Sequence, residues 1–180
     1  MNKKCFLILF FSVFFAGVHI SAQTKKEKKE QKEALEIQKF EEIQKLIESK
    51  SYEYEADWAN AQGGRRISLV TNSNYIRIKG DSIFAEMPYF GVVRGGGAGY
   101  NEGGGIKIKN KIEEFSIEIN EKKKKILLKF SAKGNSDNYD FIVNVFNSGS
   151  GRVNVLSSYK SPIVYDGYFS EIKKEKEKSE

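Results

Sequence analysis

The densest group of glycines in the sequence could form a loop that binds phosphate. Eight of the 16 glycines fall between Gly91 and Gly105. A Rossmann fingerprint needs Gly-x-Gly-x-x-Gly at the start of a helix, but counted from Gly95 its last position is Tyr100. A Walker loop needs lysine where Gly105 stands, and a predicted strand follows, so no helix N-terminus would direct its amides at an anion. The glycines therefore favour a mobile hairpin loop.

Two short motifs resemble parts of the serine enzymes that recognise penicillins. Ser157 and Lys160 have the Ser-x-x-Lys spacing, and residues 136–138 spell Ser-Asp-Asn. In those enzymes the lysine follows the serine by one helical turn, whereas this tetrad joins a predicted strand to Pro162. The order of the motifs is also reversed, and the sequence contains no Lys-Thr-Gly. We therefore interpret both motifs as coincidental.

Acidic residues could support hydrolysis without histidine. The available pairs are Asp137 with Asp140 and Glu113 with Glu114. The ordinary interpretation of both pairs is that they are solvated charges in turns. Calcium would need an oxygen-rich loop, and residues 135–140 lack the downstream glutamate of the common calcium loop. We predict no catalytic residue, no metal and no cofactor.

The candidate ligand-binding residues flank the glycine-rich loop. They are Tyr89, Phe90, Arg94 and Tyr100. Aromatic side chains around a mobile loop at one end of a barrel can form the mouth of a ligand site. Phe90 alternatively plugs the barrel end as part of the core. The sequence leaves both interpretations open.

The N-terminal residues have the layout of a secretory signal peptide. Two lysines precede an apolar run over residues 5–18, and small residues stand just before Gln23. We predict a signal peptide over residues 1–22, cut after Ala22, and a periplasmic or secreted protein. An uncleaved anchor is the alternative, but the apolar run is shorter than the about 20 residues that span a bilayer.

Cleavage after Ala22 would restrict the chemistry of the mature chain. It would remove Cys5 and His19, the only cysteine and the only histidine, and lower the formal charge from +6 to +4 by removing Lys3 and Lys4. Disulfides, a cysteine nucleophile, a Ser-His-Asp triad and a zinc site with histidine or cysteine ligands are then excluded. Stability must come from an ordinary hydrophobic core.

Residues 23–50 are predicted to form a charged helix with a narrow apolar stripe. Residues 24–50 contain eight basic and seven acidic side chains, so they offer no basic field to nucleic acid or to a membrane surface. We expect a solvated helix with one docking stripe, and a flexible charged tail over residues 171–180. The apolar side chains of the stripe recur at intervals of three and four and are Ile37, Phe40, Ile43 and Ile47.

Residues 51–170 are predicted to form a single antiparallel β domain. Residues 52–58 alternate strictly, which places Tyr52, Tyr54, Ala56 and Trp58 on one face. Further segments of this kind, separated by turn signals, give about eight to ten strands with no helix between them. We favour a lipocalin-like up-and-down β-barrel, because the connections are short enough for hairpins. A two-sheet β-sandwich is the alternative.

Several segments of this domain resemble a known family. They are GDSIFAEMPYFG at residues 80–91, the GGGIKIK after Tyr100, and later GRVNVLSS and SPIVYDGY. Together they resemble domain-of-unknown-function family 4251, a group of exported proteins from Bacteroidetes-type bacteria. The resemblance implies a signal peptide and one β-rich domain. It implies no catalytic residues, because no activity is established for the family.

Three hypotheses of function follow. The first is an exported, non-enzymatic β-barrel module that binds a small molecule or a cell-envelope partner, with no nucleic acid and with no transmembrane segment after signal cleavage. The second is a structural envelope protein that docks through its N-terminal helix. The third is a hydrolase that uses carboxylates alone, which would need two inward-facing acids in one cavity.

Overall fold

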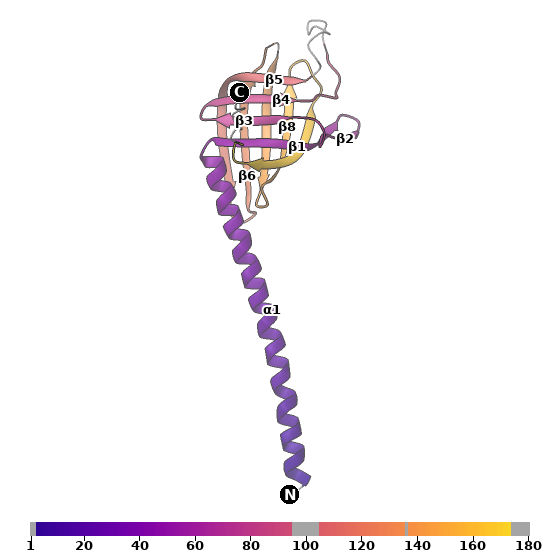
Figure 1. Cartoon of the computed structure of the whole chain (residues 1–180), viewed down its shortest axis with the longest axis vertical. Helices are drawn as coiled ribbons and strands as arrows, with labels where there is room; N and C mark the ends of the chain where they lie inside the picture. The colour runs from indigo at the N-terminus through magenta and orange to yellow at the C-terminus, as the bar shows by residue number, and fades with distance from the viewer. Residues whose placement is uncertain (1–2, 95–104, 136, 174–180) are drawn as a thin grey trace, which may run out of the picture. The chain divides into compact units, whose positions relative to one another are not determined.

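One helix precedes nine strands in the structure, which is a computed structural model (Figure 1). It describes residues 3–94, 105–135 and 137–173, with side chains from Lys25 onward. The chain divides into two compact units, Met1–Gln38 and Lys39–Glu180. The elements are α1 (Lys3–Glu48), β1 (Ser51–Ala61), β2 (Arg66–Ser68), β3 (Tyr75–Lys79), β4 (Ser82–Met87), β5 (Ile106–Asn120), β6 (Lys125–Lys133), β7 (Asn138–Phe146), β8 (Ser150–Ser157) and β9 (Ile163–Ser170).

The strands form a closed antiparallel barrel. Strands β1 and β3 to β9 pair in chain order, and β9 pairs back to β1, so eight strands close the ring. The short β2 is an additional strand beside the second half of β1. Figure 1 shows β1, β3 and β4 running across the view in front of the upright β6 and β8. The predicted up-and-down barrel is confirmed, and the sandwich alternative is wrong.

Strand β5 is longer than the sequence pattern indicated. Two apolar alternations, at residues 106–109 and 114–119, belong to this one strand. The pairing of β5 with β6 shifts register between Glu113 and Ser116, and Glu114 has a positive φ of 52°. This bulge bends the strand without ending it, because pairing with β6 resumes beyond it.

The predicted alternation of β1 stops at a second bulge. The register between β1 and β9 shifts between Ala56 and Trp58, and one extra residue inverts the faces of all later residues. Trp58 therefore lies on the outer side, where the Arg66 guanidinium is 4.3 Å from the ring centre. Ala59 takes the inward position and is fully buried. The prediction that Trp58 shares the inner face is wrong.

Side chains fill the interior of the barrel. A ligand-sized cavity would leave solvent-accessible area on the side chains that line it, and the largest interior side chains have almost none. The barrel therefore encloses a packed core. The largest of these side chains, each less than 2% exposed, are Tyr54, Tyr165, Phe141, Ile47, Leu69, Ile78, Ile83, Met87, Ile106, Ile126, Leu128 and Ile163.

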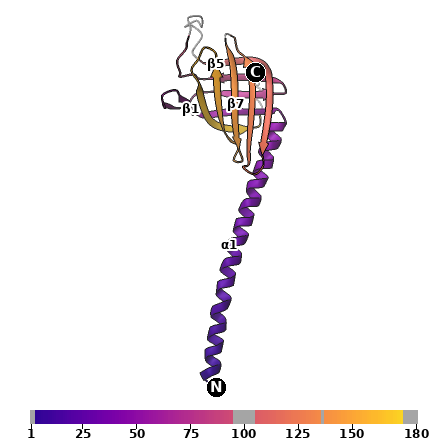
Figure 2. The ribbon, with the colours of Figure 1, turned by 180° about the vertical axis from the view of Figure 1, so that it is seen from behind.

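The last turns of α1 belong to the same core. Phe40, Ile43 and Ile47 are buried with the barrel side chains, whereas Ile37 is 45% exposed. Most of the predicted stripe is therefore covered by the chain's own barrel. We call this end of the barrel the helix end; Figure 2 shows it from behind. Among the residues described with their side chains, no helix is long and apolar enough to cross a membrane.

Candidate functional site at the loop end of the barrel

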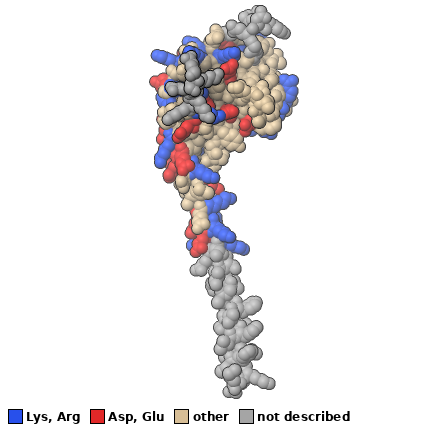
Figure 3. Space-filling model, viewed as in Figure 1, with Lys and Arg blue, Asp and Glu red and all other residues tan. Residues whose placement is uncertain are grey.

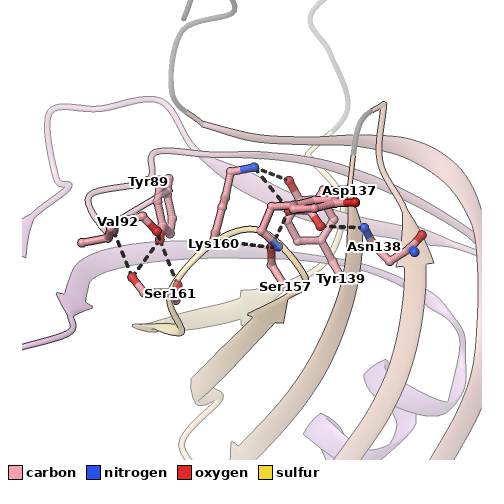
Figure 4. Close-up of polar contacts among 9 residues, drawn as sticks. Tyr89, Val92, Asp137, Asn138, Tyr139, Ser157, Lys160 and Ser161 are labelled. Carbon is pink, nitrogen blue, oxygen red and sulfur yellow. Dashed lines mark hydrogen bonds and ion pairs between the residues drawn. The ribbon is translucent and has the colours of Figure 1, made fainter. Parts of the chain in front are cut away.

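Three of the connections at the other end of the barrel, which we call the loop end, are joined by polar side chains (Figure 4). They join β4 to β5, β6 to β7 and β8 to β9. These connections lie at the same end because successive strands run in alternating directions. The glycine-rich loop predicted from the sequence is part of the first connection, and its residues 95–104 lie outside the described residues. The described parts of these connections are held together by buried polar side chains (Figure 4).

The first polar group joins the β6–β7 connection to the end of β8. The Ser157 hydroxyl donates a hydrogen bond to the Asp137 carboxylate. The Lys160 Nζ lies 3.4 Å from Asp137 Oδ2 and 3.1 Å from the Tyr139 hydroxyl. The Asp137 side chain is 1% exposed and that of Lys160 is 9% exposed. This is a buried ion pair whose two members both have further hydrogen-bond partners.

The second polar group joins the β4–β5 connection to the β8–β9 connection. The Tyr89 hydroxyl lies 2.9 Å from both the side-chain and the backbone oxygen of Ser161. Backbone hydrogen bonds run from Ser161 to Val92 and from Arg94 to Tyr159, at 2.9 and 2.6 Å. The two groups together form what we call the polar clasp: Tyr89, Asp137, Tyr139, Ser157, Lys160 and Ser161.

Gly91 makes room for the second group. A Cβ atom at this position would collide with the hydroxyls of Tyr89 and Ser161. Because both hydroxyls hold the connections together, a side chain at Gly91 would have to displace them. This glycine is therefore needed for close approach.

The electrostatics of the clasp favour a charged lysine beside a neutral tyrosine. Burial alone would lower the pKa of Lys160, but the hydrogen bond with Tyr139 and the charge of Asp137 outweigh it and hold that pKa above its ordinary value. Burial raises the pKa of Tyr139, although Lys160 acts in the opposite direction. At neutral pH the ammonium group therefore donates to both the carboxylate and the phenol.

The hydrogen bonds of Ser157 show what the clasp does. Its hydroxyl donates to Asp137 and accepts from the backbone N–H of Lys160, at 3.0 Å. Strand β8 ends at Ser157, and a turn follows instead of the helix that penicillin-recognising enzymes use. In this geometry the clasp fixes three connections to one another.

Among the described residues, no three histidine, cysteine or acidic side chains group closely enough to hold a metal ion.

The structure places three of the four predicted ligand-binding residues at the loop end. Tyr89 is part of the clasp, and Phe90 is partly buried against the core, as the plug alternative requires. Arg94 is exposed and pairs through its backbone with Tyr159. Tyr100 lies outside the described residues. Ligand binding by these residues stays a prediction.

Sequence reasoning did not identify the clasp. Asp137, Ser157 and Lys160 belong to the two motifs that we interpreted as coincidental; Ser136, the first residue of one motif, lies outside the described residues. The interpretation considered each motif only as part of a known enzyme site. The signal that could have revealed the cluster is the placement of both motifs at the same end of a closed barrel.

Beside the clasp is a strip of exposed apolar side chains. Val92 is 61% exposed, Val93 46% and Tyr159 52%. Val93 forms a β-bridge with Lys160, so the strip has a fixed backbone. We call residues 92–94 and 159–161 the rim.

The fold and the clasp define a small closed β-barrel domain with a packed interior. Residues 34–169 match the model of the family described as Domain of unknown function (DUF4251), and the chain belongs to this family. The resemblance noted in the sequence is therefore confirmed.

One solved structure with a similar fold is the crystal structure of a DUF4251 family protein from Bacteroides eggerthii. It superposes with a TM-score of 0.57 at 12% sequence identity and covers 74% of this chain and 87% of that chain. At this identity the likeness concerns the fold alone. A comparison with curated proteins finds no match.

Proposed function

We propose that the chain is an exported, non-enzymatic β-barrel module that binds a partner in the bacterial cell envelope. The contact is made by the rim, and no small molecule enters the barrel. The observation that carries this proposal is the packed interior, because side chains without accessible area leave a ligand no room. Binding must then use the outside of the molecule.

The rim is the outer surface best suited to a protein partner. Val92, Val93 and Tyr159 are exposed apolar side chains on a strip whose backbone is held by hydrogen bonds. A strip that is already ordered loses little conformational entropy on binding, and tyrosine supplies a large contact with few rotatable bonds. Arg94 beside them adds a charge that can select an acidic neighbour.

The geometry of the buried acids supports a non-enzymatic role. Among the described residues the buried acids are Glu53 and Asp137. Glu53 lies near the start of β1, at the helix end, and accepts a 2.7 Å hydrogen bond from Arg77. Asp137 lies at the loop end and is paired with Lys160. A hydrolase that uses two carboxylates would need both in one cavity.

The structure gives less support to docking through the N-terminal helix. Phe40, Ile43 and Ile47 are already buried against the barrel, which leaves Leu35 and Ile37 as exposed apolar side chains on the part of the helix whose side chains are described, from Lys25 onward. Figure 3 shows acidic and basic side chains intermingled along that part. Two apolar side chains on a charged helix are a small docking surface.

Photo-crosslinking in exporting cells tests the rim. A photoreactive amino acid at Val92 or Tyr159 is expected to give a discrete crosslinked species. The same amino acid at Lys109, an exposed position on the barrel wall, should give none. Equal crosslinking from all three positions, or none from the rim, would contradict the proposal.

N-terminal sequencing tests export separately. The processed chain is expected to begin at Gln23. Recovery of a chain that begins at Met1 from the exported fraction would contradict signal cleavage.

A further inference from the structure

A lysine-rich turn at the helix end points to a second contact of the molecule. It connects β5 to β6 and contains Glu121 and four consecutive lysines at residues 122–125. We call residues 121–125 the lysine tip. We propose that this tip binds the anionic surface of a lipid bilayer. The inference rests on the proposed export, because an exported protein of the cell envelope lies close to a bilayer surface.

The hairpin that carries the tip continues past its neighbour on one side. Strand β4 pairs with β5 only as far as Lys111, whereas β5 and β6 remain paired to Asn120 and Lys125. The turn itself is ordered, because the Lys123 backbone N–H donates to Asn120 Oδ1 at 2.9 Å. The tip therefore presents its lysines from a fixed backbone at the edge of the barrel.

Two of the four lysines of the tip, Lys122 and Lys123, are exposed and differ from paired lysines on the same hairpin. Two lysines of β6 face a glutamate on β5: Lys129 faces Glu118 and Lys133 faces Glu113, both at 3.5 Å. Lys122 and Lys123 have no ion-pair partner in the part of the chain that the structure describes. Four lysines and one glutamate leave the tip with a formal charge of +3.

Residues 39–48 of α1 pack at this same end and do not add positive charge. They contain two lysines and three glutamates. Positive charge at the helix end therefore comes from the lysine tip together with the exposed Lys79 and Lys111, which lie at the same end of their strands.

Apolar side chains beside the tip fit the interfacial layer of a bilayer. Phe146, opposite Lys125 in the β6–β7 register, is 39% exposed, and the Lys125 Nζ lies 5.7 Å from its ring centre. Ile119 is 37% exposed. Lysines that contact lipid phosphates, together with partly exposed apolar side chains that reach the acyl boundary, are the combination that holds peripheral proteins on anionic membranes.

The size of the tip favours a lipid surface over nucleic acid. A protein that binds a duplex tightly distributes several phosphate contacts along a groove, and one turn cannot do this. A bilayer needs no such length, because each lysine near the surface contributes independently, roughly a fivefold change in partitioning. Removing two of them should weaken binding by about 25-fold.

Vesicle sedimentation with the processed chain tests the proposal. The vesicles are phosphatidylcholine alone, and phosphatidylcholine with about one third phosphatidylglycerol. The test variant is K122Q/K123Q, and the matched control is K107Q/K109Q, which removes the same charge from exposed positions on the wall of the barrel, away from the helix end. All four lysines are exposed, so urea unfolding should show that both variants are as stable as the wild type.

The wild type and the control are expected to sediment with the anionic vesicles only, and K122Q/K123Q should bind them about 25-fold more weakly. Salt at about 1 M should release the protein, because it shortens the screening length to about 3 Å. Equal losses in both variants would show that only net charge matters and would overturn the proposal. Equal binding to neutral vesicles, or binding to neither kind, would also overturn it.

Mass spectrometry of the purified chain keeps the two proposals apart. A chain that begins at Met1 contradicts signal cleavage and could bind all vesicles through its apolar N-terminal segment. The ratio between the two lysine variants still tests the tip in that case, because both carry the same N-terminus.

Discussion

At the helix end, the barrel is closed by apolar side chains of α1 that pack with Tyr52 and Phe169, whose rings lie 5.7 Å apart. At the loop end, the polar clasp holds three connections together through an ion pair and hydroxyl groups. Both ends exclude solvent from the core, but by different interactions.

This difference determines how each end responds to change. Apolar contacts are non-directional, so each side chain contributes roughly in proportion to its buried area. A buried polar cluster depends on the presence of every member, because removal of one leaves another without its partner. The helix end should therefore be sensitive to volume, and the loop end to charge and to pH.

Raising the pH above 10 is expected to have the largest effect, because it acts on both ends. Burial raises the pKa of Tyr52 at the helix end, of Tyr54 and Tyr165 in the interior, and of Tyr139 in the clasp. The unfolded chain ionises these phenols near pH 10, so above that pH the folded state binds more protons than the unfolded state. The free energy of unfolding should then fall by about 1 kcal/mol per phenol for each pH unit.

The raised pKa of Lys160 also makes the free energy of unfolding fall at high pH. The stability that this group contributes is present below the ordinary pKa of lysine and is lost as the pH rises through the raised pKa. Urea unfolding at pH 8 and above pH 10 measures the combined effect. An unchanged free energy of unfolding over this range would contradict the burial of these groups.

Substitution of Ile47 by alanine tests the apolar closure of the helix end. Ile47 is 1% exposed, and the cavity left by Ile47→Ala should lower the free energy of unfolding by about 3 kcal/mol. Ile37→Ala is the matched control on the same helix, where an exposed side chain should change it by less than about 0.5 kcal/mol. Similar losses in the two variants would show that α1 does not seal the barrel as described.

Substitution of Asp137 by asparagine tests the ion pair of the clasp. Asparagine keeps the shape but removes the charge that balances Lys160, and we expect a loss of about 2 kcal/mol in denaturant unfolding. Glu86→Gln is the control, because the 3.5 Å pair of Glu86 with Lys107 is exposed and should contribute little. Adding Lys160→Met to the first variant should restore part of the loss, and failure to do so would argue against coupling between the two residues.

Replacing a tyrosine by phenylalanine should change the free energy of unfolding in opposite directions at the two ends. Within the described residues the buried Tyr52 hydroxyl has no hydrogen-bond partner, so Tyr52→Phe should stabilise the fold by up to about 1 kcal/mol. The Tyr139 hydroxyl accepts from Lys160, so Tyr139→Phe should destabilise it by about 1 kcal/mol. Losses of equal size in both variants would remove the distinction between the two ends.

The strands were predictable from the sequence because their inner faces alternate with the period of a strand. Short connections then favoured a barrel of sequential hairpins, which is the observed order. The bulge before Trp58 was not predictable, because an aromatic side chain continues the apolar alternation whether it points inward or stacks outside on Arg66.

The clasp was not predictable for a different reason. Asp137 and Ser157 are polar residues in turn-like segments, where solvation is the usual state. Their contact exists only because neighbouring hairpins bring the β6–β7 connection and the end of β8 together at one end of the barrel. Sequence spacing alone contains no measure of that distance.

The packed interior implies that any binding partner contacts the outside of the barrel. Dissolved xenon enters apolar cavities in proteins, so methyl NMR of the processed chain under xenon pressure tests this claim directly. We expect no saturable shift at the buried methyl groups of Ile83, Ile126 and Ile163. Saturable shifts at these methyl groups would show a hollow barrel and contradict the account.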